Sequence, residues 1–163
     1  MKKKLIGLLV LILIGAIIGI LISCFQYLAH LIINGANFLI TAKLWVFIIT
    51  IFGALIGIYL LMIINKKHPG YYGSGIPQFE GYQHWDFFIN PYKMLILMFV
   101  NSFYAFFTFF LLGSEGPSIS IASSIGLANN RIAKNDDKHL VAACGSAGFA
   151  CAFLSPLAGL CHL

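Results

Sequence analysis

Charged residues are scarce in this sequence. Asp, Glu, Lys and Arg make up 9% of its 163 residues, against roughly 25% in an ordinary soluble domain. Hydrophobic residues make up 60%, and the mean hydropathy is +0.93. A chain with so few charges cannot cover a soluble surface, so the composition indicates an integral membrane protein whose first partner is the lipid bilayer.

Acidic residues are rarer than basic ones, five against ten, which gives a net charge of +5. A basic balance can indicate binding to nucleic acid, but here the basic residues flank apolar runs and form no stripe interleaved with aromatic residues. We therefore expect no nucleic-acid partner. The basic residues are instead typical of signals that set membrane topology.

The sequence also lacks the patterns of metal sites, disulfide frameworks and hydrolases. Its four cysteines lie in apolar stretches without C-x-x-C or paired-histidine spacing, which favours a packing role and no cofactor. Ser74, Glu80 and His84 have no G-x-S-x-G context, so we do not expect an enzyme.

Long apolar runs are what the sequence has in abundance. Three of them span Leu5 to Phe25 (continuing to Ile33), Leu44 to Asn65, and Pro91 to Leu112. Each is long enough for a helix to cross a hydrocarbon core of about 30 Å. The runs predict an all-α, polytopic membrane protein in a cell membrane.

The first two runs predict a helical hairpin. Asn34 to Lys43 is expected to connect them on the outer side, and the lysines at both ends of the hairpin place the N-terminus and Lys66 in the cytoplasm. Small residues in the first run also predict close helix packing there, namely Gly7, Gly15 and Gly19.

A short pattern, Gly-Ser-x-x-Pro, occurs twice, at Gly73 to Pro77 and at Gly113 to Pro117. Proline is favoured in a first helical turn, and glycine allows a tight turn before it, so each copy predicts the start of a helix. The first amides of a helix attract anions. Two such starts facing one point would bind an anion without any cation; the alternative is two unrelated breaks.

Glu115, inside the second copy, is isolated. Between Asp86 and Arg131 the only other formal charge is Lys93. Placing an acid at membrane depth costs free energy, so such a residue is first considered a candidate for function. The alternative is that Glu115 caps the helix that begins there.

Three segments together resemble a known family. GSGIP at 73–77, GSEGP at 113–117 and AACGSAGFACAFLSPLAG at 142–159 are similar, in order and spacing, to the first half of CLC voltage-gated chloride channels and chloride/proton antiporters. The resemblance implies tilted and broken, re-entrant helices, two halves of inverted topology, and homodimers. It also implies chloride, with protons in the antiporters, as the transported ligand.

The resemblance assigns roles to particular positions. Ser74 matches the serine whose hydroxyl binds the central chloride, and Glu115 matches the gating glutamate that blocks the path as a carboxylate and exchanges protons. The implied anion-binding residues are Gly73, Ser74, Gly75, Ile76, Ser114 and Gly116.

Two departures from the family pattern matter. Ser114 stands where the family has a basic residue, and the chain ends at Leu163, where the family continues for more than the same length again. We therefore expect one transmembrane domain over residues 1–163 that is the incomplete N-terminal half of a transporter, dimeric once completed. The choice between channel and antiporter stays open, as do a non-transporting membrane packing or assembly protein and a truncated product without function.

Overall fold

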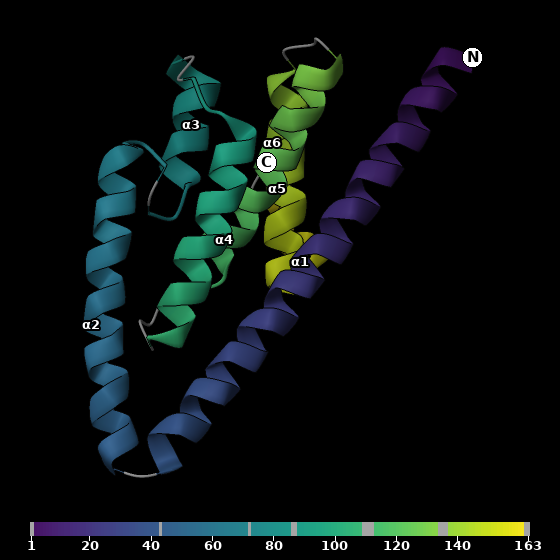
Figure 1. Cartoon of the computed structure of the whole chain (residues 1–163). Helices are drawn as coiled ribbons and strands as arrows, with labels where there is room; N and C mark the ends of the chain where they lie inside the picture. The colour runs from purple at the N-terminus through teal and green to yellow at the C-terminus, as the bar shows by residue number, and fades with distance from the viewer. Residues whose placement is uncertain are drawn as a thin grey trace.

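The computed structural model describes residues 2–42, 44–71, 73–85, 88–108, 113–133 and 137–161. Throughout these ranges the regular secondary structure is helical, which confirms the all-α prediction (Figure 1). In chain order the helices are α1 (Lys2–Ala42), α2 (Leu44–Lys67), α3 (Ile76–Trp85), α4 (Pro91–Phe107), α5 (Glu115–Ala133), α6 (Lys138–Ala152) and α7 (Pro156–Cys161).

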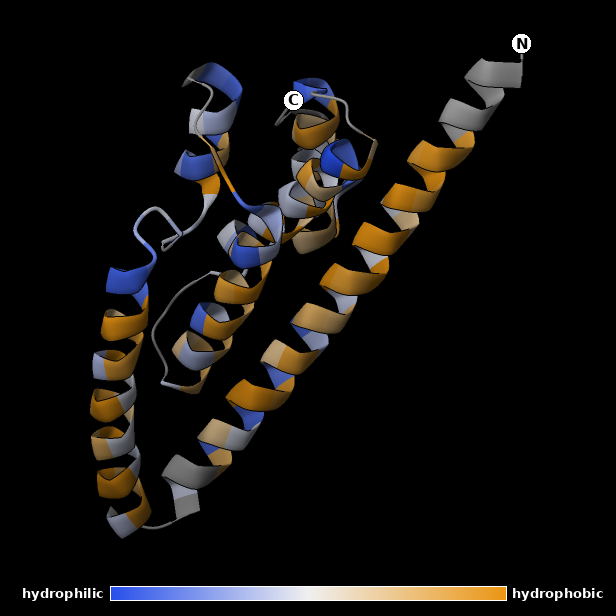
Figure 2. Cartoon of the chain, turned by 45° about the horizontal axis from the view of Figure 1, so that its top comes forward, coloured by the Kyte–Doolittle hydropathy of each residue, from blue (hydrophilic) through white to orange (hydrophobic). Residues whose placement is uncertain are grey.

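Helices α1 and α2 are long, apolar and mostly uncovered by the rest of the chain. Leu9–Phe38 and Trp45–Lys67 are each long and apolar enough to cross a membrane. In their most apolar windows 22% and 0% of the residues are buried, whereas a core helix of a soluble protein would be mostly buried. Figure 2 shows the hydrophobic colour running along both helices. Lipid is the solvent that suits such surfaces.

Helix α1 is longer than predicted. It continues through Asn34 to Ala42, a stretch predicted as a connection. That stretch contains no proline, and a single glycine does not end a helix that is already propagating. At 1.5 Å per residue, 41 residues extend about 60 Å, so α1 must tilt or project beyond the bilayer. Lys43, predicted on the outer side, lies outside the described residues.

Helix α5 is the centre of the bundle. Seven consecutive residues, Ser118 to Ser124, are buried, and α5 packs most extensively on α6 and then on α4. Small residues make this possible. A Cβ added at Gly148 of α6 would lie 2.6 Å from Ala122 Cβ and 2.7 Å from the Ser118 carbonyl oxygen. Small residues thus let α5 and α6 approach closely.

The close packing predicted around the glycines of the first run is not found at Gly15 or Gly19 among the described residues. An added Cβ at Gly15 or at Gly19 would meet nothing within 4 Å, and the surroundings of Gly7 lie outside the described side chains. Helix α1 packs on α4 through large side chains instead. Phe25 packs against three aromatic rings of α4, with centroid distances of 5.4, 5.3 and 6.0 Å to Phe99, Phe103 and Phe106.

Gly148→Ala tests the close packing of α5 and α6. The added methyl group meets backbone rather than a flexible side chain, so the helices must separate. We expect a loss of about 1–3 kcal/mol of stability, measured by thermal unfolding of the purified protein in detergent. The matched control is Gly19→Ala, which should leave stability unchanged or raise it slightly, because alanine favours helix over glycine. Equal unfolding temperatures for Gly148→Ala and the wild type would contradict this packing.

Candidate functional site

The two Gly-Ser-x-x-Pro segments lie in contact. Helix α3 begins at Ile76 and helix α5 at Glu115, as predicted. A Cβ added at Gly116 would lie 2.9 Å from Ser74 Cβ, and Ser120 Oγ donates a hydrogen bond of 2.7 Å to the Ser74 carbonyl oxygen. Of the two alternatives left open by the sequence, the structure has the two helix starts side by side rather than as unrelated breaks.

Two glycines permit the close approach. Gly73 and Gly75 have φ values of +90° and +78°, the left-handed region that side chains disfavour. A Cβ at Gly75 would also lie 2.0 Å from Ser120 Oγ and 2.8 Å from Met94 Cε. Any larger residue at Gly75 would push the start of α3 away from α5.

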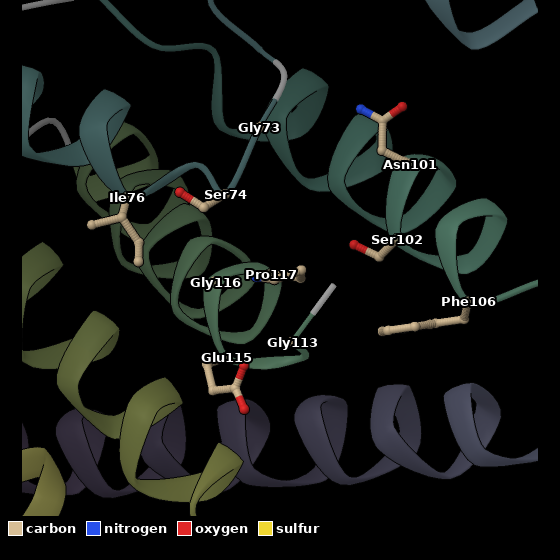
Figure 3. Close-up of a pocket in the computed structure, with 10 residues that line it drawn as sticks. All are labelled: Gly73, Ser74, Ile76, Asn101, Ser102, Phe106, Gly113, Glu115, Gly116 and Pro117. Atoms are coloured by element: carbon tan, nitrogen blue, oxygen red, sulfur yellow. The ribbon is translucent and has the colours of Figure 1, made fainter. Parts of the chain in front are cut away.

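A cavity of about 240 Å³ lies where the two helix starts meet the middle of α4 (Figure 3). Its lining consists of Gly73, Ser74, Ile76, Asn101, Ser102, Phe106, Gly113, Glu115, Gly116 and Pro117. Five of the seven predicted site residues are among them. The other two, Gly75 and Ser114, support the lining from behind: the Ser114 carbonyl accepts hydrogen bonds from the Ser118 amide at 3.1 Å and the Ser118 hydroxyl at 2.7 Å.

The sequence interpretation missed the wall that α4 contributes. Asn101 and Ser102 line the cavity, and Phe106 lies one turn further along the same helix. A signal was present, because Asn101 and Ser102 are adjacent polar residues inside an otherwise apolar run, and polar residues at membrane depth are functional candidates.

The two helix starts, and no cationic side chain of the lining, could attract a small anion to this cavity. Glu115 is the one ionisable side chain among the lining residues, which include no lysine, arginine or histidine. The amides in the first turns of α3 and α5 have no intrahelical acceptor and give each helix start a partial positive charge. Within the described residues, no group of three or more His, Cys, Asp and Glu could hold a metal ion.

Glu115 is half-buried and does not cap α5. No hydrogen bond joins its carboxylate to another described residue, so the capping alternative has no contact to support it. A Cβ at Gly113 would lie 1.8 Å from Glu115 Oε2, which shows that the carboxylate is folded back over Gly113. In Figure 3 the carboxylate is turned toward α1, while the Ser74 hydroxyl is turned toward Ile76.

A second cavity, of about 280 Å³, adjoins the first between α2 and α4. The two cavities share Gly73 and Asn101 as lining residues. Asn101 Nδ2 donates to Asn65 Oδ1 at 3.3 Å, and the Tyr104 hydroxyl donates to the Ala54 carbonyl at 2.6 Å. Polar groups therefore continue from the helix starts toward α2.

Comparison with known proteins finds a matching family and similar transporters. Residues 56–162, more than half of the chain, match the family described as Voltage gated chloride channel. The H(+)/Cl(-) exchange transporter ClcA of Vibrio cholerae is 29% identical over 161 residues, covering 91% of this chain and 34% of that protein. The ClcA proteins of Vibrio campbellii and Citrobacter koseri are 28% and 30% identical, covering 90% and 79% of this chain and 33% and 28% of those proteins.

The chain thus spans about a third of the length of the curated relatives it matches. Over that length the match includes both Gly-Ser-x-x-Pro segments and every helix from α3 to α6. This chain belongs to the voltage gated chloride channel family.

Proposed function

We propose that this chain forms part of a chloride pathway across a membrane. The anion occupies the cavity between the starts of α3 and α5, which Ser74, Gly73 and Gly116 line and which Gly75 supports from behind. The single observation that carries the proposal is the convergence of two helix N-termini on a cation-free cavity whose one ionisable lining group is Glu115. Such a cavity attracts an anion through amide dipoles.

Glu115 is proposed as the gate and as the proton-carrying group. Its carboxylate and a chloride ion compete for the same amides, so a neutral or displaced Glu115 leaves the cavity to chloride. The conformation with the carboxylate folded over Gly113 corresponds in this proposal to the displaced position. The names of the relatives, H(+)/Cl(-) exchange transporters, favour proton coupling in this chain as well.

The proposal extends to topology and assembly. The N-terminus of α1, the C-terminus of α2, the N-terminus of α4 and the connection between α5 and α6 lie toward one end of the bundle (Figure 1). Every described Lys and Arg belongs to these ends: Lys2, Lys3, Lys4, Lys66, Lys67, Lys93, Arg131 and Lys138. We place this end in the cytoplasm of a cell, following the positive-inside rule. Residues 1–163 form one transmembrane domain, which works in a homodimer.

Glu115→Gln tests the gate. Because the relatives are about three times as long, the chain is co-expressed with the part of the Vibrio cholerae relative that follows the aligned region and reconstituted into liposomes. Acid neutralises the carboxylate, so wild-type chloride flux should rise as external pH falls. Glutamine mimics the neutral form and should give flux that no longer varies with pH and moves no protons.

Co-purification of the two parts serves as the assembly control for both proteins. Parallel curves of chloride flux against pH for the wild type and Glu115→Gln would contradict the gating role. An assembled wild type that passes no chloride would instead favour a packing or assembly function.

Gly113→Ala tests the displaced position of the carboxylate. A methyl group there overlaps Glu115 Oε2 and drives the carboxylate toward the cavity, so chloride flux should fall roughly fivefold or more, the effect of about 1 kcal/mol of coupling. In a Glu115→Ala background the same change should have no effect. Gly53→Ala is the matched control, since its Cβ would meet nothing within 4 Å. An equal loss of chloride flux in both backgrounds would show that Gly113→Ala acts by changing the backbone and not by displacing the carboxylate.

Cysteine labelling tests the topology. In a background without the native cysteines, a membrane-impermeant maleimide added outside intact cells should label Asn37→Cys and should not label Lys67→Cys. Both positions are exposed in the structure, so accessibility within the protein does not decide the result. Labelling of Lys67→Cys but not Asn37→Cys would invert the proposed orientation.

A further inference from the structure

Ser102, in the middle of α4, is buried and yet opens onto the cavity. Its exposed fraction is 5%, and it lines the cavity together with Ser74, Glu115 and Gly116. Figure 3 shows the Ser102 hydroxyl pointing toward Pro117, across the space between α4 and the first turn of α5.

The Ser102 hydroxyl makes no hydrogen bond with any described residue. Hydroxyls in helices commonly donate to the carbonyl four residues earlier. Several others in this chain do so at 2.7–3.1 Å: Thr41, Thr50, Thr108, Ser118 and Ser124. No described residue therefore uses the Ser102 donor, although the residue as a whole is buried, and this calls for an explanation.

The surroundings of the Ser102 hydroxyl differ from those of Ser146. The Ser146 hydroxyl also lacks a partner, but it is closed off inside the protein, with an exposed fraction of 4% for the residue. The Ser102 hydroxyl is not among the fully enclosed atoms and borders a space that can hold an ion. Its free donor is therefore directed at whatever fills the cavity.

We propose that Ser102 Oγ donates a hydrogen bond to the halide ion held between the starts of α3 and α5. This inference rests on the proposed function and adds a third element, α4, to an anion site otherwise built from two helix starts. The donor approaches from the side opposite α3, so an anion in the cavity links α4 to α3 and α5. Phe106 lies beside Ser102 on the same wall and limits water around the ion.

The inference predicts that Ser102 affects anion binding and not folding. Chloride binding is measured by isothermal titration calorimetry in detergent on the co-purified assembly used for the flux test, with sodium gluconate as the exchange salt. Ser102→Ala should weaken chloride binding about tenfold, the usual effect of losing one hydrogen bond to a charged group. Without chloride, its unfolding temperature should equal that of the wild type, because the hydroxyl has no partner in the protein to lose.

Ser146→Ala is the matched control, since it removes an equally buried hydroxyl that borders neither cavity. It should leave chloride affinity unchanged. Ser102→Thr retains the hydroxyl and should keep affinity closer to the wild type than Ser102→Ala does.

The possible outcomes separate this inference from the proposed function. If the wild type binds chloride and Ser102→Ala binds it equally well, the proposed hydrogen bond from Ser102 is contradicted, while the proposed anion site is supported. If Ser102→Ala unfolds or loses stability in gluconate, the hydroxyl has a structural partner and the inference is overturned. If neither the wild type nor Glu115→Ala binds chloride, the proposed anion site itself fails, and the Ser102 contact with it.

Discussion

The contact between the starts of α3 and α5 is the feature on which the rest of the site depends. Ser74 lies in contact with Gly116, and the Ser120 hydroxyl donates a hydrogen bond to the Ser74 carbonyl. A helix that starts inside a membrane leaves amide N–H groups without acceptors, and each unsatisfied group costs several kcal/mol in hydrocarbon. When two such starts lie together, their unpaired amide N–H groups surround one cavity, where a single anion can accept hydrogen bonds from them.

Dense packing around α5 accompanies this contact. Helix α5 runs through the centre of the bundle, where seven consecutive residues, Ser118 to Ser124, are buried. The small residues facing it, such as Gly148 opposite Ala122, allow the backbones of α5 and α6 to approach closely. On the outside, α1 and α2 present apolar surface of the kind that lipid solvates. The interior is therefore dense and weakly polar, and the exterior is apolar.

Helix α4 has two roles in this arrangement. Its aromatic side joins α1 through Phe25 and Phe103, and its polar side faces the cavity through Asn101 and Ser102. The polar side also continues toward α2, where Asn101 meets Asn65. Side-chain amides and hydroxyls in this region lower the cost of placing a charge there, compared with hydrocarbon alone.

Local features of the sequence determined the helical class, the membrane setting and the starts of α3 and α5. Proline, glycine and charge act within a few residues, so Pro77 and Pro117 could be interpreted without knowing what lies nearby. The isolation of Glu115 was equally visible. The small residues of the first helix were misleading, because an added Cβ at Gly15 or Gly19 would meet no described residue within 4 Å, whereas one at Gly148 would meet α5.

The tertiary structure decided what local pattern could not, because the distances involved separate residues far apart in the chain. It brought Ser74 to Gly116, turned the Glu115 carboxylate onto Gly113, and placed Ser102 on the cavity wall. Which face of α4 meets the cavity depends on how α1 packs against its other face. That packing is a sum of many weak contacts between helices, and no short stretch of sequence specifies it.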